Sequence, residues 1–164
     1  MGGLTALPYR LGVGIMLFNR LGEVFVAKRI DMISEAWQMP QGGVDAHETE
    51  EEAAWRELRE ETGVTRARLL AKSRDMLRYD LPDELVPKIW GGKYRGQEQR
   101  WFALQFEGAD SEINIATQEP EFSEWKWVRM EEVPALIVPF KRELYQKLVD
   151  EFAPLRAQCS SVAP

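Results

Sequence analysis

The chain has very little cysteine and histidine, with one residue of each among 164. A single cysteine, Cys159, can form neither an intramolecular disulfide nor a pair of thiol ligands for a metal. Long apolar runs are also missing, because the longest, Leu11 to Phe18, has eight residues, whereas a membrane span needs about 20. The chain does not open on a charged segment followed by an apolar one and a cleavage site, the pattern of an export signal. We therefore expect a cytoplasmic protein with no membrane partner.

The residues that are present suit one folded domain. Hydrophobic residues make up 45% of the chain and charged residues 29%, with six Trp, four Tyr and seven Phe. This composition excludes a disordered chain, a collagen and a coiled coil. Since a domain takes roughly 100 to 200 residues, we expect a single domain over residues 1–153. Residues 154–164 should form a flexible C-terminal tail in which Cys159 is incidental.

Acidic residues outnumber basic ones by 27 to 21, and the excess lies in one segment. Between Gly42 and Gly63 there are eight acids and two bases, a local net charge of −6, so nineteen acids and nineteen bases remain elsewhere. From Arg66 to Arg100 there are nine bases and five acids. An overall negative charge argues against nucleic acid as a partner. A concentrated anionic site can nevertheless receive an anionic substrate when cations neutralise it, and a divalent metal is the natural candidate.

Hydrophobic alternation predicts a set of strands. Segments 10–18 and 24–29 are typical of strands joined by a turn at Asn19 to Gly22, whereas Pro40 and two glycines should break any regular element in 37–43. Further extended segments are expected at 67–81, 98–107 and 124–130, the last with Trp125 and Trp127 packed on the sheet, and a loop at 83–97.

Two helices complete the predicted elements. One begins at a capping box of Thr49 and Glu52 and ends at Gly63, a residue suited to the left-handed end of a helix. The other is amphipathic and covers 140–152. Strands before, between and after two helices favour a mixed α/β sandwich.

The first helix carries acids where helix stability alone would not put them. At about 100° per residue, Glu57, Glu60 and Glu61 share an arc of roughly 100°. Like charges at these spacings repel, and the last turn of a helix disfavours anions. A solvated charged face is the ordinary explanation of an acidic run, but these three positions instead suit Mg²⁺ or Mn²⁺, which prefer clustered oxygen ligands.

The segment GGVDAHETEEEAAWRELREETGV, which starts at Gly42, resembles the Nudix box. Every fixed position is filled, by Gly42, Glu48, Arg56, Glu57, Leu58, Glu60, Glu61, Gly63 and Val64. The resemblance implies an α/β/α sandwich around a mixed β-sheet and hydrolysis of nucleoside diphosphates linked to another moiety. It also implies that Glu57, Glu60 and Glu61 ligate two or more Mg²⁺ or Mn²⁺ ions, with the Gly42 carbonyl as a further ligand. Arg56 would then orient a carboxylate, and Glu48 would support the geometry of loop and helix.

Outside the box, segments such as YRLGVGIMLF, AWQMPQGGVD, LRYDLP and VPFKRELY are similar to bacterial RNA pyrophosphohydrolases and the related dinucleoside polyphosphate hydrolases. That resemblance implies that Glu121 assists as metal ligand or base, although Glu119 is a nearby competitor and either could be a plain surface residue. It further implies substrate contacts from Arg10 and Lys141 to phosphates, and from Arg29, Val138 and Phe140 to a 5′-terminal base. The loop 30–36 is longer than expected for this family and carries Ala36 where a polar residue is usual, which bears on recognition of the first base.

Three functions remain open at this point. The first is a metal-dependent RNA 5′-pyrophosphohydrolase that leaves a 5′-monophosphate and initiates mRNA decay, and the second is a hydrolase of diadenosine tetraphosphate and pentaphosphate. The third is a Nudix-like RNA or nucleotide sensor without turnover, which the complete set of box carboxylates disfavours. His47 is expected to be a turn residue and not the general base. Arg95 and Arg100 could hold RNA phosphates or be merely solvated, and no obligate protein partner is evident.

Overall fold

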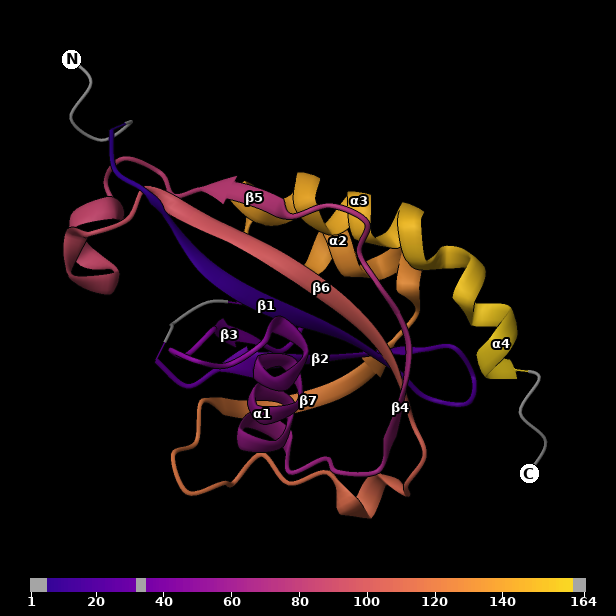
Figure 1. Ribbon diagram of the computed structural model, residues 1–164. Coiled ribbons are helices and arrows are strands. Elements are labelled where there is room, and N and C mark those ends of the chain that lie inside the picture. The colour runs from indigo at the N-terminus through magenta and orange to yellow at the C-terminus, as the bar shows by residue number, and fades with distance from the viewer. Residues whose placement is uncertain (1–5, 32–34, 161–164) are drawn as a thin grey trace.

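The computed structural model describes residues 6–31 and 35–160. Its centre is a mixed β-sheet in which the strands lie in the order β4-β6-β1-β2-β7, with β3 paired to β1 and β5 paired to β6 (Figure 1). The strands are β1 Tyr9–Phe18, β2 Val24–Arg29, β3 Gln41–Gly43, β4 Ala67–Lys72, β5 Leu77–Asp80, β6 Gly96–Phe106 and β7 Phe122–Val128. Only the central pair β1 and β6 is parallel among these pairings.

Four α-helices and six short 3₁₀ turns complete the described chain. The helices are α1 Glu50–Thr62, α2 Val133–Leu136, α3 Arg142–Phe152 and α4 Arg156–Ser160. The 3₁₀ turns are η1 Val86–Lys88, η2 Trp90–Gly92, η3 Asp110–Glu112, η4 Met130–Glu132, η5 Pro139–Lys141 and η6 Ala153–Leu155. No described helix is long and apolar enough to span a bilayer.

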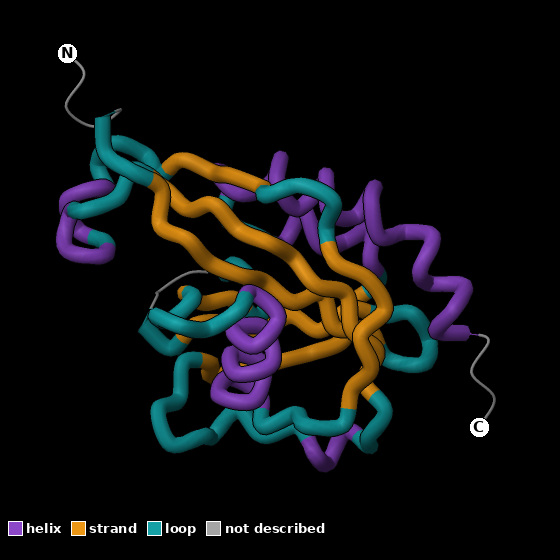
Figure 2. Tube along the Cα trace, viewed as in Figure 1, coloured by secondary structure: helices purple, strands orange, loops and turns teal. Residues whose placement is uncertain are grey.

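The sheet is covered by helices on both faces. Successive residues of a strand point to opposite faces, and β1 supplies both cores. Its side chains Val13, Ile15 and Leu17 pack with Ala54 and Leu58 of α1. Met16 and Phe18 pack instead with the helices on the other face, where the core includes Leu144, Tyr145, Leu148 and Phe152 of α3. Figure 2 shows α1 in front of the sheet and the C-terminal helices behind it, which confirms the α/β/α sandwich.

The local signals at the ends of α1 are confirmed. The Thr49 hydroxyl accepts a hydrogen bond from the Glu52 backbone N–H at 3.1 Å, and the Glu52 carboxylate accepts one from the Thr49 N–H at 2.8 Å. Gly63 follows the last turn with φ 72°. The turn between β1 and β2 is also as expected, because the Gly22 N–H donates to the Asn19 carbonyl at 3.1 Å. Helix α1 is thus capped at both ends, which fixes where it begins and ends.

The structure corrects the sequence prediction for the segment before α1 and for the C-terminal residues. Segment 37–43 was expected to contain no regular element, but Gln41–Gly43 forms β3, because the glycines let the backbone run beside β1. Residues 154–164 were expected to be a flexible tail, but Ala153–Leu155 and Arg156–Ser160 are helical and Cys159 has 0% exposure within the core. The chain is therefore helical to residue 160, with Cys159 part of the same core as Leu148 and Phe152. Part of the loop 30–36, residues 32–34, lies outside the described residues.

Candidate active site

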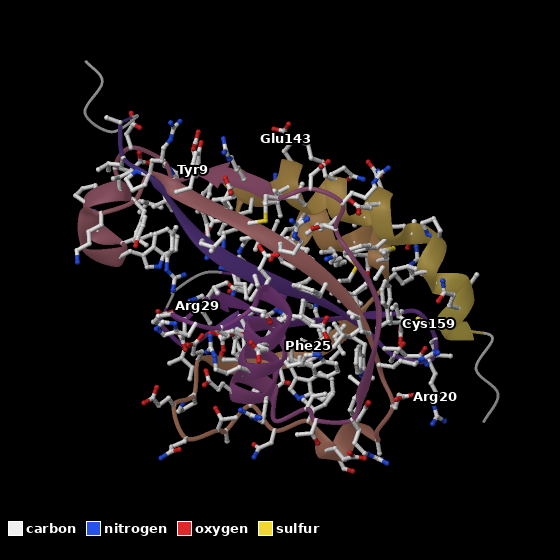
Figure 3. All side chains as sticks on the ribbon, viewed as in Figure 1. Tyr9, Arg20, Phe25, Arg29, Glu143 and Cys159 are labelled. Atoms are coloured by element: carbon white, nitrogen blue, oxygen red, sulfur yellow. The ribbon has the colours of Figure 1, made fainter. Side chains whose placement is uncertain are left out.

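A cleft of about 630 Å³ lies between β3, the ends of β2 and β5, and the segments 85–90 and 137–141. Its walls include eight of the residues predicted from the sequence, namely Arg10, Arg29, Gly42, Glu57, Glu121, Val138, Phe140 and Lys141. Arg56, Glu60 and Glu61 lie behind or beside the cleft wall and are not part of its lining. Figure 3 shows Arg29 on the same side of the molecule as β3, whereas Cys159 lies in α4 at the other side.

Arg56 connects the loop before α1 to the helix itself. Its Nε and Nη2 donate to the two carboxylate oxygens of Glu48 at 2.7 and 2.9 Å, and its Nη2 also donates to the Gly43 carbonyl at 2.9 Å. Its Nη1 donates to Glu57 Oε1 at 2.8 Å. This bidentate arrangement is a strong form of hydrogen bond, and it lowers the pKa of Glu48 to about 2. Arg56 is therefore placed to orient Glu57, and Glu48 to fix Arg56.

Glu57 occupies space that only a glycine could leave free. A Cβ built on Gly42 would overlap the Glu57 carboxyl group. The same carboxylate also forms an ion pair with Arg56. The glycine pair of β3 and the arginine of α1 thus fix one carboxylate at the cleft wall.

Glu61 is buried without a hydrogen-bond donor. Its side chain is 2% exposed, and neither carboxylate oxygen accepts a hydrogen bond from any described residue. Burial raises the pKa of Glu61 well above its usual range, and the charges of Glu121 and Glu57 raise it further. Burial also raises the pKa of Glu57, against the opposing effect of Arg56. Buried carboxylates without donors are costly, so this oxygen-rich group fits a divalent cation.

Glu60 is turned away from this pair. Its side chain is 55% exposed, and its Oε2 accepts a hydrogen bond from Arg56 Nη1 at 3.2 Å. Within residues 6–31 and 35–160, no three His, Cys, Asp or Glu side chains are gathered closely enough to enclose a metal ion. Mutual repulsion spreads like charges, and Arg56 offers Glu60 an alternative partner. The role of Glu60 as a metal ligand stays a prediction.

Of the two distant acids, Glu121 is the one at the cleft. It lines the cavity, and its charge acts on both Glu61 and Arg29. Its backbone carbonyl accepts a hydrogen bond from the Ile30 N–H at 2.8 Å, which anchors it beside the end of β2. Glu119 is exposed and does not line the cleft.

Three cations that line the cleft, Arg10, Lys88 and Lys141, have no acidic partner among the described residues. The Arg10 guanidinium carbon lies 5.2 Å from the centre of the Trp90 ring. Lys141 is 8% exposed, and its Nζ lies 4.9 Å from the centre of the Tyr79 ring. Burial, with a smaller contribution from Arg29, lowers the pKa of Lys141 to about 8. Unpaired positive groups, Arg10 and Lys141 among them, therefore line the same cavity as Glu57 and Glu121.

A fourth cation of the cleft, Arg29, is already paired. The Arg29 Nε and Nη2 donate to Asp31 at 2.8 and 2.7 Å. The apolar wall predicted beside it is present, because Val138 and Phe140 line the cavity and the Phe140 ring lies 5.9 Å from that of Tyr79. Arg29, Val138 and Phe140 are thus brought together as the sequence suggested, and their contact with a base stays a prediction.

Sequence reasoning missed Tyr79 and Trp90, the two aromatic residues that contact the unpaired cations. Tyr79 is buried and donates from its hydroxyl to Gln97 Oε1 at 2.9 Å. Trp90 lies in the predicted loop 83–97, where no periodicity marks it. The one feature of the sequence that marks Trp90 is the pair of glycines that follows it in this loop.

Three further predictions concern residues around the cleft. His47 is exposed in a turn with φ 69°, which agrees with its interpretation as a turn residue. Arg100 donates to the carbonyls of Ser73 and Arg74 and to Glu50, and Arg95 forms an ion pair with Asp80. Trp125 and Trp127 stack on Phe25 and Phe106 respectively and belong to the sheet.

A model of the NUDIX domain matches residues 8–148. The chain belongs to the Nudix family. Several Nudix relatives are similar over almost their whole length, among them the protein named RNA pyrophosphohydrolase of Rhodospirillum rubrum, which is 56% identical and is matched over 91% of this chain and 90% of its own. The protein of that name from Erythrobacter litoralis is 58% identical, over 91% and 93%, and that from Rickettsia bellii is 50% identical, over 92% and 93%.

Solved Nudix structures have the same fold at much lower identity. The C. elegans Ap4A hydrolase in a binary complex gives a TM-score of 0.65 at 19% identity, over 88% of this chain and 98% of that one. The E. coli dihydroneopterin triphosphate pyrophosphohydrolase gives 0.63 at 20% identity, over 88% and 99%. Nudix hydrolases in general need divalent metal ions, and the buried Glu61 carboxylate without a hydrogen-bond partner fits such an ion.

Proposed function

We propose that this Nudix protein is a metal-dependent RNA 5′-pyrophosphohydrolase, which converts triphosphate or diphosphate 5′ ends to monophosphate and so initiates mRNA decay. The observation that carries the proposal is the cleft itself, in which the unpaired cations Arg10 and Lys141 face the carboxylates Glu57 and Glu121. A polyphosphate needs positive partners for its own charge and a metal site for the bond that breaks. The name shared by relatives at 50–58% identity supports the same substrate.

Glu57, Glu61 and Glu121 are the residues that would hold Mg²⁺ or Mn²⁺, in two or more sites, with Glu60 and the Gly42 carbonyl as further ligands. When bound, the divalent ions supply charge neutralisation and an activated water. Glu57 is kept in place by Arg56 and by the lack of a side chain at Gly42. Glu121 is the candidate for accepting a proton from the attacking water.

The rest of the cleft would bind the 5′ end of the RNA. Arg10 and Lys141 would contact the phosphates, because charged donors bind phosphate oxygens without reading sequence. Phe140 and Val138 would contact the terminal base, with Arg29 beside it, since splayed RNA bases stack on aromatic rings and guanidinium planes.

The test is a product analysis with a short RNA that carries a 5′-triphosphate. In Mg²⁺ the protein is expected to release the γ- and β-phosphates and to leave a 5′-monophosphate RNA. Glu57→Gln and Glu61→Gln should each abolish turnover while their circular dichroism spectra stay those of the parent protein. Full turnover by either variant would contradict the assignment of the metal site.

A dinucleoside polyphosphate hydrolase is the second candidate function. It would use the same carboxylates on a bridging anhydride of diadenosine tetraphosphate or pentaphosphate. The cleft is compatible with this function, because the wall at Phe140 could hold one adenine of such a substrate as well as a terminal base of RNA. A non-catalytic sensor of RNA or nucleotides is disfavoured, because a binding module gains nothing from keeping Glu61 buried without a donor.

A further inference from the structure

The loop between β5 and β6 contains a strained residue that the proposed function does not use. Trp90 has φ 51°, a left-handed conformation that residues with a side chain rarely adopt. Gly91 and Gly92 follow it with φ 66° and 74°. Strain of this kind persists where the surrounding structure enforces it and is concentrated at functional sites. We therefore expect the Trp90 side chain to have a function that accounts for this backbone conformation.

The Trp90 side chain faces the cleft and contacts a cation there. Its ring lines the cavity, with the Arg10 guanidinium carbon 5.2 Å from the ring centre and the Tyr94 ring edge-on at 6.2 Å. The end of the loop is linked to the residue before β1, because the Arg95 N–H donates a hydrogen bond to the Pro8 carbonyl at 3.0 Å. Figure 2 shows its helical turns at the end of the sheet where β1 and β6 begin.

Arg10 is held between this ring and the backbone of β3. A Cβ built on Gly43 would overlap Nη2 of Arg10, so the guanidinium lies directly against that glycine. The neighbouring residue, Gly42, is in the same kind of contact with Glu57. Arg10 forms no ion pair with any described residue. Its position is therefore set by an aromatic face and a glycine, next to the proposed catalytic carboxylate.

We propose that Trp90 is a positioning residue for phosphate recognition, which acts by holding the Arg10 guanidinium. This inference rests on the proposed function for the identity of the substrate. An aromatic face leaves the in-plane N–H groups of a guanidinium free for bidentate bonds to phosphate. A carboxylate partner would occupy the same donors and would compete with the substrate. Trp90 thus orders Arg10 without neutralising it.

The first experiment is a double-mutant cycle on Michaelis kinetics with 5′-triphosphate RNA. Trp90→Ala is expected to raise KM roughly 3- to 10-fold, the range of a cation–π contact, with kcat within about twofold of the parent. Trp90→Phe keeps an aromatic face and should recover most of the loss. In an Arg10→Ala background, Trp90→Ala should change KM by less than about twofold. Equal effects in both backgrounds would overturn the proposal.

Two variants separate positioning from folding. Trp90→Gly removes the same core-packed ring as Trp90→Ala but relieves the left-handed backbone, so it should be at least as stable as Trp90→Ala and show the same raised KM. Trp127→Ala removes a half-buried tryptophan of the sheet that does not line the cleft, and it should lower thermal stability with KM unchanged. A raised KM in Trp127→Ala would assign the effect to stability and contradict the role of Trp90.

A binding measurement with inorganic tripolyphosphate at fixed free Mg²⁺ tests the role of Trp90 separately from the proposed hydrolysis of RNA. The same non-additivity of Trp90→Ala and Arg10→Ala in Kd, without any turnover of RNA by the parent protein, would sustain the inference and refute the proposed function. RNA turnover with additive effects would refute the inference alone. If Trp90→Ala weakened RNA but left tripolyphosphate binding unchanged, the ring would stack on a base, and positioning through Arg10 would be wrong.

Discussion

The carboxyl group of Glu57 lies directly against Gly42, in space that any side chain at residue 42 would fill. The same carboxylate accepts a hydrogen bond from Arg56 Nη1 at 2.8 Å. The glycine of β3 and the arginine of α1 therefore act together on one carboxylate. Both residues belong to the Nudix box, and the fold brings them together at the Glu57 carboxylate.

Gly42→Ala is expected to displace Glu57 and to lower kcat by about 100-fold, the loss that a shift of roughly 1 Å can cause at a catalytic group. The matched control is Gly108→Ala, since a Cβ there also meets a glutamate, the flexible end of Glu112. Gly108→Ala should keep the parent kcat. Parent-like kinetics in Gly42→Ala would contradict the fixed position of Glu57.

Glu61→Gln is expected to stabilise the protein in EDTA at neutral pH. Because the pKa of Glu61 is raised on folding, the unfolded chain releases this proton first, and the free energy of unfolding falls as the pH rises from the ordinary value of 4.5 towards the raised pKa. Glutamine has no such proton to lose, so the substitution should raise the melting temperature at neutral pH by about 3 °C or more, with the difference vanishing near pH 4. Thermal melts across this pH range measure it.

The same variant should lose most of the stabilisation that Mg²⁺ gives the parent protein, because a ligand that binds only the folded state raises its stability. Equal Mg²⁺-dependent shifts of melting temperature in the parent and in Glu61→Gln would show that Glu61 is not part of the metal site.

Substrate affinity is expected to fall as the pH rises above about 8. Burial lowers the pKa of Lys141 to about 8, so the protonated form that binds phosphate is lost above this value, and KM should rise by up to about tenfold per pH unit. Lys141→Arg keeps its charge and should show a flat KM between pH 8 and 10. A rise of equal size in this variant would rule out Lys141 as the cause.

The thiol of Cys159 is expected to react slowly with a disulfide reagent in the native protein. It has 0% exposure, and burial raises its pKa, which lowers the thiolate fraction. Labelling in urea should be on the order of 100-fold faster than in buffer. Fast labelling of the native protein would instead support the flexible C-terminal tail that the sequence predicts.

Cys159 also illustrates what the sequence could and could not predict. The ends of α1 follow from local signals at Thr49, Glu52 and Gly63, so the box helix and its carboxylates were predictable. The C-terminal residues have the composition of a tail, and their burial depends on a core formed by distant strands. Trp90 and Tyr79 escaped prediction for the same reason, because each matters through a cation far away in the chain.

The central claim is that the cleft hydrolyses RNA 5′ ends, and one competition assay tests it most directly. Short 5′-triphosphate and 5′-diphosphate RNAs would be offered in Mg²⁺ together with diadenosine tetraphosphate and pentaphosphate, and kcat/KM would be obtained for each. We expect an advantage of at least about tenfold for an RNA, and its loss in Glu57→Gln. A preference for the dinucleotides, or no turnover of any substrate, would contradict the claim.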